Sequence, residues 1–308
     1  MFKNLARSVR AFTEELKRNG EAPPRPAAQR PKIGIALGGG FARGLAHIGV
    51  LKVLEEEGIP VDMVAGTSVG SVIGAAYCAG ISGRELEEVA AVVRFSSIAR
   101  YSLSRFGICS NDRLGAFLTK ILKVGRFEDL KVPLAVAATD FTTGDGVIFR
   151  EGPLCDPVRA SCAYPGMFPP VSVNGRLLVD GMLAHVVPTV PLREMGADRV
   201  IGIFLTSKWT KQGGPRHVFE VVSQCFSIAQ DKMCGLWQGA ADLVLSPYVS
   251  GFGFDDFALA PALIRAGEEA TRAALPQMKQ WLEVPAPATE KARAPRPQVA
   301  PAQAITTG

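Results

Sequence analysis

Ser68 lies in the pentapeptide Gly66-Thr67-Ser68-Val69-Gly70, which has the pattern Gly-x-Ser-x-Gly. An apolar, strand-like run precedes this pentapeptide and a helical pattern follows it. Between a strand and a helix, the pattern is typical of a nucleophile elbow, a sharp turn that exposes the serine hydroxyl for attack on a carbonyl carbon. The same serine would also suit a helix N-cap. The strand–turn–helix context favours the nucleophile.

A serine nucleophile needs a base that takes its proton. Asp180 ends a strand-like run and precedes Gly181, so its carboxylate is expected on a turn at the end of a strand. His185 and His217 are the histidines that follow Ser68 in the chain, and neither has the setting after a late strand that a Ser–Asp–His order requires. Asp180 is therefore the candidate base, although aspartate in such a place can simply form the turn.

The segment LGGGFARG, from Leu37 to Gly44, joins another predicted strand to a helix. Its glycines let backbone N–H groups approach a ligand, and a helix N-terminus favours negative charge. The ligand would be a dinucleotide pyrophosphate, a nucleotide phosphate or a transient oxyanion. Leu45 follows Gly44 where a P-loop needs lysine, and Arg43 occupies the third glycine of the dinucleotide fingerprint. The loop alone does not identify its anion, and a nucleotide-binding module stays an alternative.

Strands and helices alternate around these three motifs. Strands are predicted over 32–37, 61–65, 132–138 and 199–205, and helices over 44–57 and 69–79. This alternation predicts an α/β fold, a three-layer α/β/α arrangement with a mainly parallel central sheet. The uncharged run 63–83 is long enough to span a bilayer, but its glycine, serine and threonine content favours a strand and a helix instead.

Four local signals refine this outline. Ser82 and Glu85 have the spacing of a capping box. Asp156-Pro157 predicts an N-cap before a proline in the first turn. Asn174-Gly175 predicts a hairpin turn. The segment 94–114 mixes aromatic residues with arginines and is interpreted as a lid or a lipid-facing edge, or else as an ordinary connecting helix.

The net charge of +5 is concentrated at the two ends of the chain. Residues 1–30 hold seven basic and three acidic residues, and residues 284–308 hold three basic and one acidic, so the rest is nearly neutral. A nucleic-acid-binding domain would carry its positive charge on a structured face, so this class is set aside. Three histidines and six cysteines show no metal-ligand spacing, so no metal is expected.

The chain is expected to divide into three parts. Residues 1–31 contain an amphipathic helix over 1–19 and a proline-rich linker, residues 32–283 form the folded domain, and residues 284–308 form a disordered tail. The basic helix suits peripheral contact with an anionic membrane, or packing on the domain or a second subunit. No signal peptide is evident, which favours a cytoplasmic location. The oligomeric state is not indicated.

The motifs together resemble the patatin-like phospholipase family, in its bacterial branch. The resemblance rests on GGGFARG, GTSVGS, RASCAYPGMFPPV and VDGM in this order, and it covers about residues 33–206. It implies a compact α/β/α hydrolase with a Ser–Asp dyad and no catalytic histidine. Ser68 would be the nucleophile and Asp180 the base, and the N–H groups of Gly39, Gly40 and Phe41 would form an oxyanion hole.

The resemblance also assigns the flanking Gly38 and Gly44 to this loop, which Arg43 would brace. Two positions depart from the family pattern. Phe41 replaces a small residue, so it would narrow the entry or point into an acyl pocket. Met182 replaces the small third residue of the Asp-Gly-Gly/Ala turn, which puts the tightness of that turn in question.

The resemblance implies hydrolysis of a phospholipid or another lipid ester, of the phospholipase A, lysophospholipase or esterase type, without a metal or organic cofactor. His185 stands where the family often has asparagine, and we interpret it as lying outside the reacting groups. A catalytically weak member that acts as an adaptor or regulator at the membrane surface is the alternative.

Overall fold

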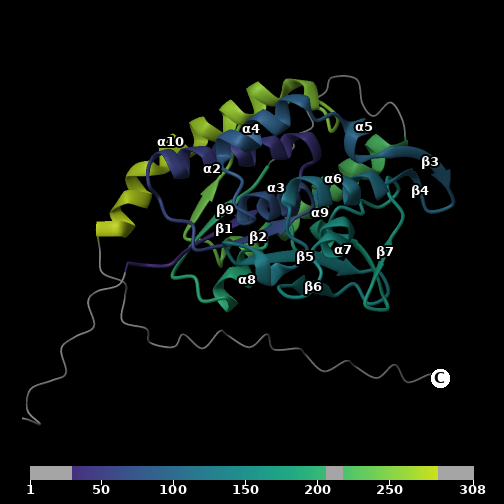
Figure 1. The fold of residues 1–308 in the computed structure, drawn as a ribbon, viewed down its shortest axis with the longest axis horizontal. Helices are drawn as coiled ribbons and strands as arrows, with labels where there is room; N and C mark the ends of the chain where they lie inside the picture. The colour runs from purple at the N-terminus through teal and green to yellow at the C-terminus, as the bar shows by residue number, and fades with distance from the viewer. Residues whose placement is uncertain (1–29, 206–217, 284–308) are drawn as a thin grey trace, which may run out of the picture. The chain divides into compact units, whose positions relative to one another are not determined.

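A computed structural model describes residues 30–205 and 218–283 of the chain (Figure 1). The helix expected over 1–19 and the tail expected over 284–308 lie outside these residues.

A mixed sheet positions the three motifs. Its strand order is β10-β9-β1-β2-β5-β8-β7, and β6 pairs with β5 outside this path. The strands are β1 (Ile33–Leu37), β2 (Met63–Thr67), β5 (Leu134–Asp140), β6 (Gly146–Phe149), β7 (Val171–Val173), β8 (Arg176–Asp180), β9 (Arg199–Ile203) and β10 (Leu243–Leu245). The strands from β10 to β5 are parallel, whereas β6, β7 and β8 are antiparallel to their neighbours. The predicted mainly parallel α/β sheet is confirmed, with an antiparallel extension beyond β5.

Strand β5 brings two distant segments together. Three strands pair with β5. The pairing with β2 ends where Thr67 lies opposite Ala137, and the pairing with β8 begins at the next residue, where Asp180 lies opposite Ala138. Strand β6 overlaps both of these pairings along β5, so β6 occupies the opposite edge. It follows that β8 continues along the same edge of β5 at the point where β2 ends. Ser68, which follows Thr67, therefore lies beside Asp180.

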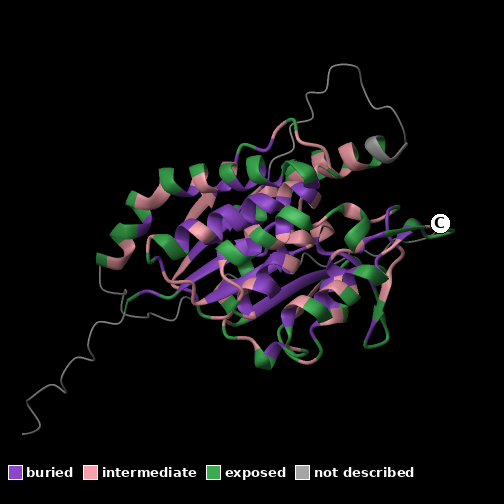
Figure 2. Ribbon diagram, turned by 45° about the horizontal axis from the view of Figure 1, so that its top comes forward, coloured by how far each residue is buried: buried purple, intermediate pink, exposed green. Residues whose placement is uncertain are grey.

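Helices cover both faces of the sheet, as Figure 1 shows. One layer contains α2 (Ala46–Glu56), α3 (Val69–Cys78), α4 (Gly83–Val92), α6 (Asp112–Leu122), α7 (Cys155–Ser161) and α10 (Ala260–Glu283). The other contains α8 (Thr189–Glu194) and α9 (Val218–Gln238). Side chains of β1 alternate between the layers, since Ile33, Ile35 and Leu37 join the first core and Ala36 joins the second. Burial on both faces explains why the central strands are continuous apolar runs, and Figure 2 shows them as buried.

Two of the local signals are confirmed. Helix α4 begins with the Ser82–Glu85 capping box. The Ser82 side chain accepts from the N–H of Glu85, and the Glu85 side chain accepts from the N–H of Ser82. Asn174 and Gly175 have φ values of 51° and 77° and form the turn between β7 and β8. This is the backbone that an Asn-Gly hairpin requires.

The helix start predicted at Asp156-Pro157 is wrong by two residues. Helix α7 begins at Cys155, with Leu154 as its N-cap. The backbone N–H of Leu154 donates to the carbonyl of Gly125, and the Asp156 carboxylate pairs with Arg159 instead of capping the helix. Tertiary pairing thus overrides the local signal.

Residues 94–114 do not form one connecting helix. They contain the short helix α5 (Phe95–Ile98), a hairpin of β3 (Arg100–Ser104) and β4 (Gly107–Ser110), and the start of α6. The uncharged run 63–83 contains β2 and α3, as expected. Within the described ranges, no helix combines the length and apolar character needed to cross a membrane.

Candidate active site

Ser68 occupies a strained turn between β2 and α3. Its φ of 55° and ψ of −128° lie outside the regions that residues other than glycine prefer. The flanking glycines make the turn possible, because a Cβ at Gly66 would collide with the backbone of Ser71 and one at Gly70 with the carbonyl of Leu37. The N–H and hydroxyl of Ser71 donate to the Ser68 carbonyl at 2.8 and 2.6 Å. The predicted elbow geometry is present.

The Ser68 hydroxyl points to Asp180. Its Oγ donates a hydrogen bond of 2.8 Å to Asp180 Oδ2, and it makes no capping bond to α3. The second carboxylate oxygen, Oδ1, accepts from the N–H of Met182 at 3.0 Å. Asp180 itself is completely buried. Ser68 thus occupies the N-cap position of α3 without capping the helix through its hydroxyl, and the two residues selected from the sequence meet directly.

Burial controls the charge of the Asp180 carboxyl. Desolvation raises its pKa to about 7, against the lowering effect of hydrogen bonds from Met182 and Ser68. A carboxyl with a pKa near neutrality can accept a proton more readily than a solvated aspartate.

The turn that holds Asp180 is tight despite Met182. Residues Gly181–Leu183 form one turn of 3-10 helix, and a Cβ at Gly181 would collide with the Ala137 carbonyl. The methionine side chain therefore does not prevent a tight turn, because the contact with Asp180 is made by the backbone N–H of Met182.

His185 follows this turn and packs against strand β6. Its ring rests against the backbone of Gly146 on β6, and its carbonyl accepts a hydrogen bond of 2.7 Å from the Thr67 hydroxyl. Burial lowers the pKa of the imidazole. Its ring is thus part of the packing around β6.

The glycine-rich loop faces Ser68. A Cβ placed on Gly39 would lie 3.3 Å from the Ser68 Cβ. The N–H groups at the two ends of the loop are engaged, Gly38 with the Ile203 carbonyl at 3.2 Å and Ala42 with the Phe254 carbonyl at 3.1 Å. In the part of the chain that the structure describes, no acceptor is found for the N–H groups of the three residues between them, Gly39, Gly40 and Phe41. These three donors are available to a ligand at Ser68.

Side chains from the following turn hold this loop in place. Arg43 Nε donates to the Gly40 carbonyl at 3.4 Å. Gly44 has to be glycine because a Cβ there would collide with Val69. His47, which sequence reasoning did not select, contacts the Gly38 carbonyl at 2.8 Å through Nε2. Burial lowers the pKa of His47 to about 4, so the ring is neutral at pH 7 and Nε2–H is the donor.

Ser161 is a second supporting residue that the sequence did not reveal. Its Oγ accepts from the backbone N–H of Ser68 at 2.8 Å and donates to the Ala137 carbonyl at 2.6 Å. The only signals for these two residues were positional: His47 follows Gly44 by one helical turn, and Ser161 lies within RASCAYPG.

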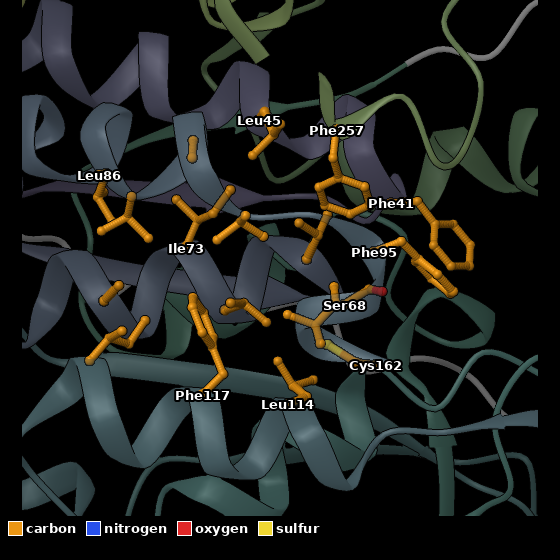
Figure 3. A pocket seen from close by; sticks show the side chains of 18 of the residues that line it. Phe41, Leu45, Ser68, Ile73, Leu86, Phe95, Leu114, Phe117, Cys162 and Phe257 are labelled. Carbon is orange, nitrogen blue, oxygen red and sulfur yellow. The ribbon is translucent and has the colours of Figure 1, made fainter. Parts of the chain in front are cut away.

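An apolar cavity of about 110 Å³ extends from Ser68 along α3 (Figure 3). Ser68 lies near the end that Phe41 and Phe95 line, and Leu86 of α4 lies toward the other end. Among the lining residues only Ser68 and Asn111 have polar oxygen or nitrogen atoms in their side chains. Much of the wall comes from three helices, with Val69, Val72, Ile73 and Ala76 of α3, Leu86, Val89 and Ala90 of α4, and Leu114, Phe117 and Ile121 of α6. The shape and lining suit a hydrocarbon chain.

A second cavity of about 50 Å³ lies against Ser68 and the glycine-rich loop. It has polar side chains from Arg43 and Tyr164 and from residues of α9, namely Ser223, Ser227 and Gln230. Phe41 lines both cavities, and its ring packs on Tyr164 at a centroid distance of 4.9 Å. Phe41 thus forms part of the wall at which the two cavities meet.

Comparison with known proteins bears on the family of this chain. The family model described as patatin-like phospholipase matches residues 35–193. An uncharacterized NTE family protein of Mycobacterium tuberculosis is 36% identical over 201 residues, which are 62% of this chain and 55% of that protein. Patatin-like phospholipase domain-containing protein 6 of Homo sapiens is 38% identical over 184 residues, 57% of this chain and 13% of that protein. The chain thus spans about half of the first relative and a small part of the second.

Among solved structures, VipD from Legionella pneumophila matches with a TM-score of 0.57 at 13% identity, over 83% of this chain and 67% of that chain. This likeness supports the fold. The family model covers the glycine-rich loop, the elbow of Ser68 and the turn of Asp180, and it spans just over half of the sequence. The chain belongs to the patatin-like phospholipase family.

Proposed function

We propose that the protein is a serine acyl hydrolase that cleaves carboxylic esters of lipids. The observation that carries this proposal is the 2.8 Å hydrogen bond from Ser68 Oγ to the buried carboxylate of Asp180, near one end of an apolar cavity. The relatives named as a lysophospholipase of Mycosarcoma maydis and a patatin-like phospholipase domain-containing protein of Homo sapiens support a lipid ester as the substrate.

In the proposed reaction, Ser68 Oγ attacks the ester carbonyl carbon while Asp180 Oδ2 takes the hydroxyl proton. The carbonyl oxygen becomes an oxyanion, which accepts hydrogen bonds from the N–H groups of Gly39, Gly40 and Phe41. The C–O bond then breaks, and the leaving alcohol takes the proton from Asp180. Water then attacks the acyl carbonyl carbon while the same carboxylate takes a proton from it. The bond from this carbon to Ser68 Oγ breaks, Oγ recovers the proton from Asp180, and the fatty acid is released.

The oxyanion donors are expected to contribute much of the rate. Loss of one such donor typically costs about 10²–10³ in kcat. Here the loop that carries the donors is fixed in place, because Arg43 and His47 form hydrogen bonds to the carbonyls of Gly40 and Gly38. The carboxylate contributes proton transfer, which its raised pKa assists.

Activity should rise with pH through the pKa of Asp180. The base must be ionised, and burial places its pKa at about 7. We therefore expect kcat/KM for an uncharged short-chain ester to fall about tenfold for each pH unit below that pKa and to level off above it. The measurement is a pH–rate profile over the range in which the protein stays folded by circular dichroism. A midpoint near the ordinary aspartate pKa of about 4 would contradict a buried base.

The length of the apolar cavity sets an expectation for the acyl chain. From Ser68 to Ala76 the cavity follows eight residues of α3, which is about 12 Å at a rise of 1.5 Å per residue. Carbon–carbon bonds of about 1.5 Å advance a staggered chain by roughly 1.25 Å each, so an extended chain needs about ten carbons to span this length. We propose a preference for medium-length acyl chains over the longer chains that fill a bilayer leaflet of about 15 Å.

Two substitutions at the deep end should move this preference in opposite directions. Ala76→Leu fills the end and should lower kcat/KM for decanoyl esters at least tenfold while butanoyl esters react normally, since each excluded methylene forfeits about 0.8 kcal/mol. Leu86→Ala opens the end and should favour chains a few carbons longer. The measurement is fatty-acid release from matched esters and lysophospholipids of increasing chain length. Unchanged profiles in both folded variants would show that the chain lies elsewhere.

A further inference from the structure

The hairpin of β3 and β4 exposes large apolar side chains to solvent. Tyr101 is 80% exposed, Phe106 64% and Ile108 40%. Figure 1 shows the hairpin at one end of the described unit, beyond α6 and α7. Side chains of this size are usually buried, and an exposed group of them marks an interaction surface.

The base of this hairpin belongs to the candidate active site. Phe95 and Ile98, just before the hairpin, and Asn111, just after it, line the apolar cavity. The N–H of Cys109 donates to the Met167 carbonyl at 2.9 Å, and the Cys109 side chain joins an aromatic cluster with Tyr164 and Phe168. The exposed hairpin is therefore fastened directly beside the cavity that we assign to the acyl chain.

Helix α9 has the same division between a lining side and an exposed side. Ser223, Ser227 and Gln230 line the second cavity. Val221, Val222 and Ile228 are 44%, 36% and 51% exposed, and residues 221–230 contain no charged residue. Both elements that flank the site thus carry apolar side chains on their outer surface.

Charge distinguishes among the partners that could cover these surfaces. Residues 93–111 contain three arginines and no acidic residue, and Arg100 and Arg105 on the hairpin are exposed. Tyrosine, arginine and other amphipathic side chains gather at the boundary between lipid headgroups and hydrocarbon. In a symmetric dimer the same patch would face itself and bring these arginines together, which disfavours a second copy as the partner.

We propose that the exposed side chains of the β3–β4 hairpin, on its two faces and at its turn, dock on a lipid bilayer that contains anionic lipids. In this orientation the candidate active site, to which the base of the hairpin is fastened, is held at a lipid surface. The docking surface differs from residues 1–19, which the sequence suggested for membrane contact. The biological role of this docking rests on the proposed lipid hydrolysis, but binding to the bilayer can be measured without catalysis.

The test uses the full chain carrying Ser68→Ala, so that binding is measured without hydrolysis. Co-sedimentation is compared on vesicles of phosphatidylcholine alone and of phosphatidylcholine with phosphatidylglycerol. The double variant Tyr101→Ser/Phe106→Ser should lower the partition coefficient at least tenfold on the mixed vesicles. The double variant Arg100→Gln/Arg105→Gln should lower the partition coefficient about thirtyfold on the mixed vesicles at low salt. On vesicles of phosphatidylcholine alone it should change the coefficient little.

The matched control is Tyr248→Ser/Phe141→Ser. These two side chains are 79% and 61% exposed, and neither residue lines either cavity. The control should bind vesicles as the parent does. Equal partition of the parent and both hairpin variants onto the vesicles would overturn the proposal. A hairpin variant that changed only the sedimentation coefficient in solution would also overturn it, because a second copy of the chain would then be the partner.

The same hairpin variants on the Ser68 background should hydrolyse a soluble butanoyl ester within about twofold of the wild type. They should lose activity on vesicle lipids in proportion to their lost binding. Absence of hydrolysis in the wild type would contradict the proposed function and leave the binding result standing. The two proposals therefore fail in distinguishable ways.

Discussion

Replacement of Ser68 by alanine should abolish ester hydrolysis and leave the fold intact. The hydroxyl is the atom that forms the acyl intermediate, and no neighbouring group can replace it. Its loss should reduce kcat to below about a hundredth of the wild-type value. Little stability should be lost, because the hydroxyl donates to Asp180 and does not cap α3, and because alanine adopts the strained φ of 55° at a cost similar to that for serine.

A fluorophosphonate probe, which labels activated serines, gives an independent measurement. It should label the wild type and the control Ser172→Ala, whose serine is exposed on β7, but not Ser68→Ala. Thermal unfolding of all three proteins establishes that the variants are folded. If folded Ser68→Ala retained more than about a hundredth of the activity, the assignment of the nucleophile would be wrong. If the wild type itself neither hydrolysed esters nor reacted with the probe, the adaptor interpretation would be favoured instead.

Asp180→Asn should lower activity by at least about 10³ while preserving the shape of the site. Loss of a general base typically costs about 10²–10⁴, and the upper part of that range is expected because Asp180 also orients the Ser68 hydroxyl. The amide cannot serve as the base, and its single oxygen can replace only one of the two carboxylate oxygens that accept from Ser68 and Met182. The measurement is the rate of ester hydrolysis by the purified variant beside the wild type.

The same substitution removes a buried ionisable group, so it should also change how stability depends on pH. Because burial raises the pKa of Asp180, its ionisation costs folding stability as the pH rises above the unfolded value near 4 and up to about 7. The Asp180→Asn protein should therefore lose less stability than the wild type across that pH range. Thermal unfolding of both proteins at several pH values checks this expectation.

His185→Ala is the companion measurement that separates a dyad from a triad. The ring of His185 rests against Gly146, so activity should change less than about tenfold. The pH–rate profile should likewise keep its single rise. An inactive His185→Ala protein beside an active Asp180→Asn protein would reverse the assignment of the base.

Local patterns in the sequence predicted the reacting groups because their chemistry is local. The Gly-x-Ser-x-Gly turn, the Asn-Gly hairpin that leads to Asp180 and the glycine-rich loop are each complete within a few residues. Their meeting was inferred from the family resemblance and not from spacing. The structure supplies its cause in the shared edge of β5.

Features that depend on several distant segments were not predictable in this way. The apolar cavity needs side chains from at least three helices, and the supporting contacts of His47 and Ser161 need partners that only the folded sheet provides. The error at Asp156 has the same origin, because the N–H of Leu154 is bound to the Gly125 carbonyl and the helix starts there, two residues earlier. The hairpin within 94–114 was also missed as a structure, since its mixed aromatic and arginine pattern resembles that of a helix with a solvated side.

The pairing of β2 and β8 with one edge of β5 also has a consequence for motion. Ser68 and Asp180 are attached to backbone that pairs with the neighbouring residues Ala137 and Ala138, so their separation depends on one stretch of buried sheet. Surface helices and the hairpin can fluctuate or open locally without stretching that part of the backbone. Amide hydrogens around Ala137 should thus exchange only through the largest opening events, with the two side chains remaining in register until the sheet itself separates.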